Sequence, residues 1–429
     1  MADLATGRVL MEKNPDLPLI PASTMKVATS SAALSTLGPD FTFVTEVLSD
    51  GAHDSSAENL YLRGSGDPYL VSEQLFALTC DVRDKGLREV RHDIVVDDSY
   101  FVPGKPLDEQ ERLGYRSYHA PYSALSLNFN SVKIVVNPDD RPGEAAEVVA
   151  DPPSAYVKVK GNVKTVRGDR PARLHFRKKR ARSGREVIRV RGVIGAKAPA
   201  KSQYLNVAAP SLYTGEVFRE FLRRQGIKVG GKVRRGKVPS TAVSYVKFRS
   251  RPLGIIVYWM NKFSNNFMAE QLGLALGAAV HGAPGTREKG LAVIRNHLLS
   301  LGVEKNCFRL AEASGLSRNN RLSSSALVRV LYSAAHRFSY YAEFASSLGV
   351  AGLDGTLRHR FTDAGVKGRI RAKTGNLRGV NALAGYGVSH DGKVFVFAVL
   401  VNSRKNGVGF VKYGERIVRA ILDLPMGSQ

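Results

Sequence analysis

The sequence predicts a mixed α/β (α+β) fold divided among two or three domains. Its 429 residues exceed what one hydrophobic core usually organises. Hydrophobic residues make up 43% of the chain and charged residues 24%, which is typical of globular proteins. Helical and strand-like patterns alternate in the first and last parts of the chain, whereas a middle part shows only strand-like alternation.

The first part reads as a short hairpin, a helix over 23–38 and a strand over 41–49. Gly38-Pro39 is a strong signal for the end of that helix. A helix over 71–86 and strands over 93–98 and 131–137 follow. The last part predicts helices over 264–280, 285–301 and 323–336, then strands over 368–375, 382–389 and 394–402.

Residues 151–205 predict a small and strongly basic all-β unit. Between residues 156 and 201 the chain holds 16 Lys and Arg but only Asp169 and Glu186 as acids, whereas the whole chain carries a formal charge of +25. This unit could bind an anionic polymer of a cell envelope. The alternative is that these side chains are the solvated outer face of strands, where cations also prevent edge-to-edge pairing. Apart from Phe176, no aromatic residue is interleaved with the cations, and no nucleic-acid motif is present, so we expect no nucleic-acid partner.

The two cysteines, Cys80 and Cys307, lie far apart and match no metal or redox spacing, so we expect free thiols. The histidines show no metal-binding spacing either, so we expect no metal. No apolar run is long enough to span a membrane. The start of the chain lacks a signal segment, and its hairpin lacks most of a first strand, so we expect that preceding residues are missing.

A serine and a lysine three positions apart occur in "PASTMKVATS", where Ser23 and Lys26 lie on one face of the first predicted helix. A serine hydroxyl needs a base, and a lysine acts as one only when its surroundings lower its pKa. The apolar neighbours of Lys26 favour that role; the alternative is a surface lysine that reaches solvent. A second such pair, Ser244 and Lys247, lies in a strand-like stretch, where the two side chains face opposite ways.

Two further strings complete the pattern. Lys373, Thr374 and Gly375 form "KTG" at the end of a predicted strand, where the cation and hydroxyl suit a carboxylate and the glycine permits close backbone approach. A plain β-turn is the alternative for this string. The pattern S-x-N occurs at Ser126–Asn128, Ser264–Asn266 and Ser317–Asn319. We favour Ser264 and Asn266, because they open a long apolar helix and are held rigidly there.

S-x-x-K, S-x-N and K-T-G in this order form the signature of penicillin-binding proteins and serine β-lactamases. Together with "ASGLSRNNRLS", "GLDGTLRHR" and "AKTGNLRGVNALAGY", the chain resembles class C low-molecular-mass penicillin-binding proteins. These are D-alanyl-D-alanine carboxypeptidase/endopeptidases of the penicillin-binding protein 4 type, with two domains inserted between the first two motifs.

The resemblance implies a serine β-lactamase/transpeptidase-like domain, an antiparallel sheet flanked by helices, with two inserted, mainly β domains. We expect the catalytic domain at 1–63 and 250–429, an inserted α/β domain at 64–150 and 206–249, and the basic all-β domain at 151–205. It also implies a serine-type carboxypeptidase that acts on peptidoglycan stem peptides, is inhibited by β-lactams, uses no cofactor and works in the periplasm or at the cell surface.

The same resemblance assigns roles to individual residues. Ser23 is the nucleophile, Lys26 its general base and Ser264 a proton relay to the leaving amine. Substrate binding falls to five residues: Asn266, Lys373, Thr374, Gly375 and Asn376. Backbone N–H groups of Ser23 and Asn376 form the oxyanion hole, which stabilises developing negative charge.

The chain departs from the family pattern at three places. Asn376 replaces the usual threonine after K-T-G, "EASGLSR" at 312–318 replaces a "DGSGLSR" pattern, and part of a first strand is missing. Two alternatives remain beside the carboxypeptidase: a non-catalytic envelope scaffold that binds anionic polymers through the basic unit, and a β-lactamase. Glu270, one helical turn beyond Asn266, either orients the site or is solvated.

Overall fold

The structure, a computed structural model, describes residues 1–53, 55–102, 104, 119–181, 184–403 and 410–422. These residues divide into two compact units. Unit 1 takes the described residues of Met1–Thr42 and Arg251–Gln429, and unit 2 takes those of Phe43–Ser250. The first unit is therefore built from two segments far apart in the sequence.

Unit 1 contains an antiparallel sheet in the order β1-β22-β21-β20-β19. Its strands are β1 (Ala2–Asp3), β22 (Val394–Asn402), β21 (Val380–Val388), β20 (Ile370–Leu377) and β19 (Gly349–Val350). The strands expected over 368–375, 382–389 and 394–402 are thus present as neighbours. A short hairpin, β17 (Phe308–Arg309) and β18 (Arg321–Leu322), lies outside this sheet.

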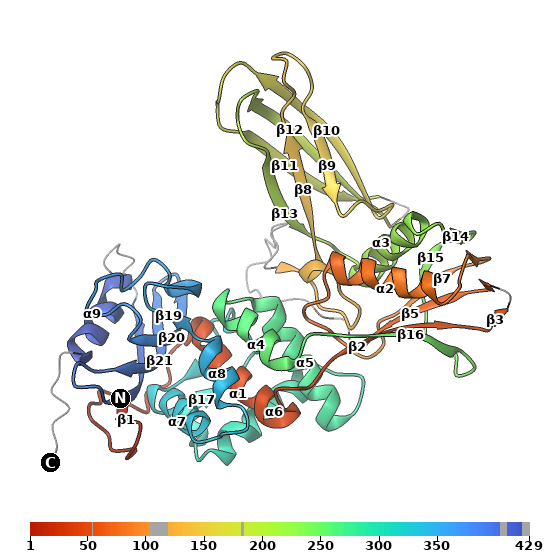
Figure 1. The fold of residues 1–429 in the computed structure, drawn as a ribbon. Helices are drawn as coiled ribbons and strands as arrows, with labels where there is room; N and C mark the ends of the chain where they lie inside the picture. Colours follow the sequence, from red (N-terminus) through yellow and green to blue (C-terminus); the bar gives the residue numbers. More distant parts are fainter. Residues whose placement is uncertain (54, 103, 105–118, 182–183, 404–409, 423–429) are drawn as a thin grey trace. The chain divides into compact units, whose positions relative to one another are not determined.

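Helices pack on this sheet and on one another (Figure 1). They are α1 (Met25–Leu37), α4 (Leu253–Lys262), α5 (Asn266–His281), α6 (Arg287–Ser300), α7 (Ser324–Ala335), α8 (Tyr341–Ser347) and α9 (Phe410–Leu422). Side-chain oxygens of Asn265, Thr286 and Ser323 cap the first turns of α5, α6 and α7 by accepting backbone N–H groups. The first ten residues of α1 are all buried, because α4, α5, α6 and α7 surround it. Its buried polar side chains are hydrogen-bonded: Thr29 and Ser30 donate to backbone oxygens, and Ser31 bonds with His297.

Unit 2 contains four sheets and two helices, α2 (Ser72–Asp84) and α3 (Pro210–Arg224). The largest sheet has the order β15-β7-β5-β2-β16, with bounds Val233–Arg235, Ile94–Asp97, Leu60–Gly64, Val44–Ser49 and Val243–Arg249. A second has the order β14-β6-β4-β3, with bounds Lys228–Val229, Glu89–Val90, Ser56–Ala57 and Ala52–His53. Apolar residues of both sheets pack with those of α2 and α3 in one core.

The basic part of unit 2 forms two three-stranded sheets. One has the order β10-β12-β11, with bounds Val157–Val166, Glu186–Gly195 and Arg173–Arg180. The other has the order β13-β8-β9, with bounds Lys201–Asn206, Ser131–Asn137 and Glu147–Asp151. The expected all-β character of residues 151–205 is thus present, and their separation as a domain of their own stays a prediction.

The compact division differs from the expected boundary at residue 63. Residues 43–63 lie in unit 2, because β2 pairs with β16 and β5 pairs with β7. Strand alternation alone could not indicate which sheet these residues join. Among the described helices, none combines the length and apolar character needed to cross a membrane.

Candidate active site

Ser23 and Lys26 lie at the start of the central helix of unit 1. Ser23 belongs to a short 3-10 turn, η1 (Ala22–Thr24), that leads directly into α1. Lys26 Nζ lies 3.1 Å from Ser23 Oγ, and the lysine side chain is fully buried. The surface-lysine alternative for Lys26 is therefore excluded. Ala22 adopts φ of +47°, which is an unusual conformation for a residue with a Cβ and turns the chain sharply just before the serine.

The ammonium or amine of Lys26 has three hydrogen-bond partners. Besides Ser23 Oγ, its Nζ donates to Asn266 Oδ1 at 2.7 Å and to the backbone oxygen of Ser314 at 2.6 Å. A neutral amine has two N–H donors and one lone pair. With its donors on Asn266 and Ser314, the lone pair of Lys26 faces the hydroxyl of Ser23.

Burial lowers the pKa of Lys26 to about 8, although the carboxyl groups of Glu312 and Glu270 act in the opposite direction. A lysine with this pKa is neutral in a substantial fraction of molecules near pH 7 to 8. It is thus suited to accept a proton from a neighbouring hydroxyl.

A second buried lysine comes from strand β20. Lys373 Nζ donates to Ser264 Oγ at 3.0 Å and to the backbone oxygen of Thr374 at 2.9 Å. Burial first, and then the positive charge of Lys26, hold the pKa of Lys373 well below its usual value. Ser264 lies in the turn between α4 and α5 with φ of +55°. This turn places the serine hydroxyl against β20, while Asn266 reaches Lys26 from the first position of α5.

Gly375 is needed because β20 passes very close to η1. A Cβ at Gly375 would lie 2.6 Å from the backbone oxygen of Pro21 and 3.1 Å from the backbone nitrogen of Thr24. Beside it, Thr374 Oγ1 bonds with Thr356 Oγ1 at 2.8 Å. Asn376 is exposed, and its Oδ1 accepts a hydrogen bond from Asn381 Nδ2 at 2.7 Å across the β20–β21 ladder.

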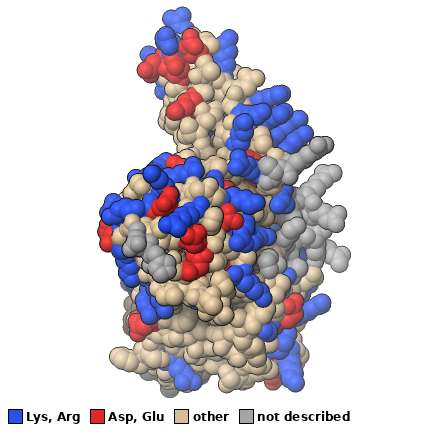
Figure 2. Space-filling model, turned by 90° about the vertical axis from the view of Figure 1, so that its right-hand side faces the viewer, with Lys and Arg blue, Asp and Glu red and all other residues tan. Residues whose placement is uncertain are grey.

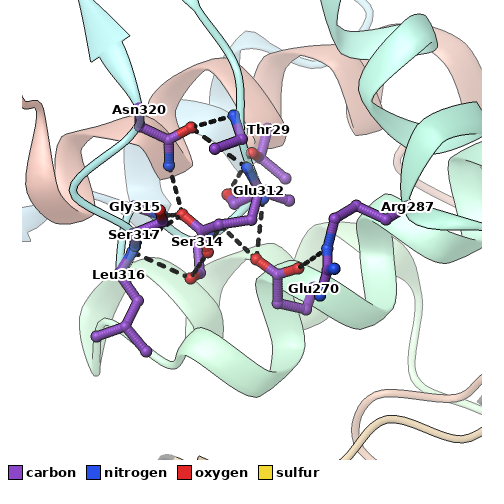
Figure 3. A network of polar contacts seen from close by, with 11 residues as sticks. Thr29, Glu270, Arg287, Glu312, Ser314, Gly315, Leu316, Ser317 and Asn320 are labelled. Carbon is purple, nitrogen blue, oxygen red and sulfur yellow. Dashed lines mark hydrogen bonds and ion pairs between the residues drawn. The ribbon is translucent and has the colours of Figure 1, made fainter. Parts of the chain in front are cut away.

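The turn 312–317 forms the floor under Lys26, and Figure 3 shows its polar contacts. Glu270 is buried and accepts backbone N–H groups of Ala313 and Ser314, so it is not a solvated surface residue. Glu312 is also buried and accepts backbone N–H groups of its own turn.

The structure brings together every residue assigned to the site; of the other candidate strings, two belong to unit 2 and one begins in the turn 312–317. Ser126 and Asn128 lie in unit 2, as do Ser244 and Lys247 on β16. Ser317 Oγ accepts the backbone N–H of Asn319, which is the local turn bond expected for it. The catalytic and binding roles themselves stay predictions.

Three contacts were missed by the sequence reasoning. The backbone oxygen of Ser314 has no signature in a sequence, because any residue type carries it. Glu312 was identified only as a difference from the family's sequence pattern. In the structure it is a buried charged neighbour that raises the pKa of Lys26. Thr356 lies in "GLDGTLRHR", which supported the resemblance but gave no role to this hydroxyl.

The site consists of a half-buried hydroxyl, a lysine with a pKa of about 8, and a second cation beside a serine and a threonine. This arrangement suits acyl transfer to Ser23 from a substrate with a terminal carboxylate. Within the described ranges, no three His, Cys, Asp or Glu side chains gather as a metal site would require. The two cysteines are free, Cys307 being buried and Cys80 half-buried.

Comparisons with known proteins agree with this chemistry. The chain is 33% identical over 428 residues to a D-alanyl-D-alanine carboxypeptidase of an Actinomadura species, which covers 94% of this chain and 77% of that protein. The crystal structure of penicillin binding protein 4 (dacB) from Haemophilus influenzae matches with a TM-score of 0.84 at 23% identity, covering 99% of this chain and 95% of that one. The same protein in complex with a β-lactam matches with a TM-score of 0.79 and the same coverage and identity.

A family match covers almost the whole chain. Residues 1–412 match the D-Ala-D-Ala carboxypeptidase 3 (S13) family. The predicted fold class and enzyme class are confirmed, and the chain belongs to the D-Ala-D-Ala carboxypeptidase 3 (S13) family of peptidases.

Proposed function

We propose that this protein removes the terminal D-alanine of peptidoglycan stem peptides through an acyl-enzyme formed on Ser23. Neutral Lys26 takes the proton of Ser23 Oγ as this oxygen bonds to the carbonyl carbon of the penultimate D-alanine. The carbon–nitrogen bond to the terminal D-alanine then breaks, and the leaving nitrogen receives the proton through Ser264 Oγ. Water hydrolyses the ester on Ser23, with Lys26 again accepting a proton, and frees the enzyme.

The remaining site residues bind the substrate in this proposal. Lys373 and Thr374 hold the terminal carboxylate by charge-assisted hydrogen bonds. Asn266 binds a peptide carbonyl, Gly375 leaves room for the substrate backbone, and the N–H group of Asn376 pairs with that of Ser23 as the oxyanion hole.

One observation carries the proposal: the fully buried Lys26 Nζ lies 3.1 Å from Ser23 Oγ, and its other two contacts are acceptors. Burial lowers the pKa of Lys26 to about 8, so its neutral amine is available to accept the proton of Ser23 Oγ. Perturbed pKa values of this kind concentrate at functional sites.

Labelling with a fluorescent penicillin tests the nucleophile, because a β-lactam acylates the serine and mimics the substrate. We expect a stable label on the wild-type protein and none on Ser23→Ala. Release of D-alanine from a stem pentapeptide, again absent in Ser23→Ala, separates the carboxypeptidase from a non-catalytic scaffold. Rapid turnover of the penicillin in place of a stable label would indicate a β-lactamase.

Cleavage of cross-linked muropeptides, followed by chromatography, would add the endopeptidase activity. Because these substrates lie outside the cytoplasmic membrane, the proposed location is the periplasm or the cell surface.

A second function, binding of an anionic envelope polymer, is supported by one face of the sheet β10-β12-β11 (Figure 1). The register places Lys160, Arg189 and Arg177 side by side across the three strands. All three are exposed. Like charges directly opposite one another destabilise a sheet, so an anionic ligand would relieve a standing repulsion. The same face carries five more exposed cations, and we call the eight the cationic face: Lys158, Lys160, Lys164, Arg173, Arg177, Lys179, Arg189 and Arg191.

The opposite side of this sheet is different in character. Lys178 points inward and forms a buried ion pair with Glu186 at 3.0 Å. Among the described residues, no acid forms an ion pair with a member of the cationic face. Basic side chains also predominate over acidic ones on the surface shown in Figure 2.

Fluorescence anisotropy with long-chain inorganic polyphosphate tests the cationic face. We expect binding that weakens steeply as salt rises, because binding releases counterions. A triple charge reversal of Lys160, Arg177 and Arg189 to Glu should abolish it. The matched control reverses three exposed cations of unit 1, with the same change in net charge: Lys13, Arg295 and Lys305. If both triple variants lost polyphosphate binding equally, binding would depend on the net charge of the protein alone. That result would contradict the proposal.

A further inference from the structure

The turn between β17 and β18 supplies one of the three contacts of Lys26 Nζ, the backbone oxygen of Ser314. This turn is tethered to the central helix as well, since Thr29 Oγ1 donates to the backbone oxygen of Ala313 at 2.7 Å. The position of a carbonyl oxygen depends on the path of its backbone. What fixes this turn therefore fixes the direction in which Lys26 points.

The carboxyl group of Glu312 organises the turn from inside. Its Oε1 accepts the backbone N–H groups of Gly315 at 2.6 Å and Ser317 at 3.4 Å, and its Oε2 accepts that of Ser314 at 3.1 Å. The hydroxyl of Ser314 and the amide of Asn320 donate to it as well. A carboxylate that accepts this many donors favours its ionised form.

Glu270 links the same turn to helix α5. It lies one helical turn after Asn266, and its Oε1 accepts the backbone N–H groups of Ala313 at 2.9 Å and Ser314 at 2.8 Å. Arg287 Nε on α6 lies 4.0 Å from its Oε2. Figure 3 shows both side chains at this turn, and each carboxyl group shifts the pKa of the other.

Both carboxyl groups are almost fully buried, with 4% of Glu270 and 3% of Glu312 exposed. Two adjacent buried carboxyl groups cannot both ionise at moderate cost, so the pair retains one proton. Burial and then the charge of Glu312 raise the pKa of Glu270 well above its usual value. The pKa of Glu312 is lowered by hydrogen bonds from Glu270 and Ser314 and by the charge of Lys26, which outweigh its burial. Glu312 accepts five hydrogen bonds whereas Glu270 accepts two, so the proton of the pair belongs to Glu270, which faces the Glu312 carboxylate.

We propose that Glu270 and Glu312 form a singly protonated carboxyl pair that positions the general base Lys26, through the Ser314 carbonyl and helix α5, and supplies its counter-charge. Both residues act through Lys26 and are positioning residues. The inference rests on the proposed role of Lys26 as the base for Ser23. Two of the three acceptors of Lys26 Nζ are carried by segments that the pair fastens together: Asn266 by α5, and the Ser314 oxygen by the turn.

The charges around Lys26 set the expected pH dependence. The negative charge of the pair, carried by Glu312 on the turn with Glu270 beside it on α5, raises the pKa of Lys26. Lys373 faces Lys26 from β20, and the positive charge of Lys26 lowers the pKa of Lys373. Arg287 faces Glu270 from α6. Burial lowers the pKa of Lys26, and the negative charge of the pair opposes this effect. Removing that negative charge should therefore lower the pKa of Lys26 further.

The test measures the second-order rate constant for acylation by a fluorescent penicillin across pH 5 to 10. Glu270→Gln keeps the proposed state, because its amide donates to Glu312 and its oxygen still accepts the two backbone N–H groups. We expect a pH midpoint like that of the wild type and a rate within about threefold of it. Glu270→Gln combined with Glu312→Gln removes the only negative charge of the pair. We expect a lower pH midpoint and at least about a tenfold lower plateau rate.

Two further variants separate positioning from general damage to the fold. Thr29→Val removes a neutral tether of the same turn, so it should leave the pH midpoint unchanged whatever it does to the melting temperature. Glu312→Asp keeps the negative charge but shortens the side chain, so it should keep the pH midpoint while reducing the acylation rate. This variant replaces the double variant as the test if the double variant does not fold.

A double variant with the midpoint and rate of Glu270→Gln would overturn the proposal. A midpoint shift in Glu270→Gln alone would overturn the assignment of the proton. Failure of the proposed function would look different, because the wild type would not label or Ser23→Ala would.

Discussion

Gly315 gives the sharpest test of how closely the turn 312–317 is fitted to the nucleophile. Its φ is +86°, and a Cβ built on it would lie 1.9 Å from the backbone oxygen of Ala22 and 3.0 Å from Met25 Cβ. Gly315→Ala therefore forces η1 and this turn apart by roughly 1 Å or more, since nonbonded carbon and oxygen atoms approach to about 3.2 Å. A displacement of this size at a catalytic group costs about 100-fold in rate.

The matched control is Gly282→Ala. Gly282 ends α5 with φ of +76°, and a Cβ there would meet no atom within 4 Å. Both substitutions incur about 1 to 2 kcal/mol of left-handed backbone strain, but only the one at Gly315 pushes on Ser23. We expect acylation by a fluorescent penicillin to slow about 100-fold in Gly315→Ala and less than about twofold in Gly282→Ala. Melting temperatures measured in parallel give the loss of stability in each. Equal acylation rates in the two folded variants would refute the reasoning.

Four other outcomes follow from the structure. The acylation rate of the wild type should rise about tenfold between pH 7 and pH 9, because the neutral fraction of a lysine with a pKa of about 8 rises from about 0.1 to about 0.9; a flat stopped-flow profile would exclude Lys26 as the base. The same lowered pKa means that the unfolded chain binds more protons than the folded one between pH 8 and 10.5, so Lys26 should make the free energy of unfolding rise with pH in this window by about 3 kcal/mol. Lys373 acts in the same direction, so denaturant titrations of Lys26→Met should show a rise that is smaller by this amount. Thr356→Val removes the partner of Thr374 Oγ1 and should raise KM for a stem peptide several-fold with kcat little changed; an unaltered KM would contradict this role. Lys178→Met leaves Glu186 buried without its cation and should lower the free energy of unfolding by about 3 to 5 kcal/mol, whereas a loss below about 1 kcal/mol in urea unfolding would show that the pair is dispensable.

Much of the fold of unit 1 follows from local patterns. Gly38-Pro39 ends α1 at the expected place, and the alternating stretches that became β20, β21 and β22 lie next to one another in a single sheet. Period and stop signals of this kind are local properties, so one sequence contains them. The helical setting of Ser23 and Lys26 also followed from their spacing, whereas the strand setting of Ser244 removed that pair from consideration.

The remainder depends on contacts between distant segments. The expected strand over 41–49 contains β2, but its partner β16 comes much later in the chain, so local patterns did not indicate that residues 43–63 belong to the second compact unit. The ionisation of Glu270 depends on Glu312, which lies more than forty positions later in the chain, and on the burial of both carboxyl groups. Packing between distant segments decides whether a carboxyl group is buried, so the neighbouring residues in the sequence do not predict its burial.

The two segments of unit 1 also constrain when the site can exist during synthesis. Ile20, just ahead of the nucleophile, is fastened to Asn402 at the end of β22: Asn402 Oδ1 accepts the Ile20 N–H at 2.9 Å, and its Nδ2 donates to the Ile20 oxygen at 3.2 Å. The ribosome therefore makes this anchor 382 residues after Ile20. Contacts so distant along the chain form late in folding. A nascent chain should therefore remain inert toward β-lactams until β22 has emerged, so acylation reports that this strand is in place.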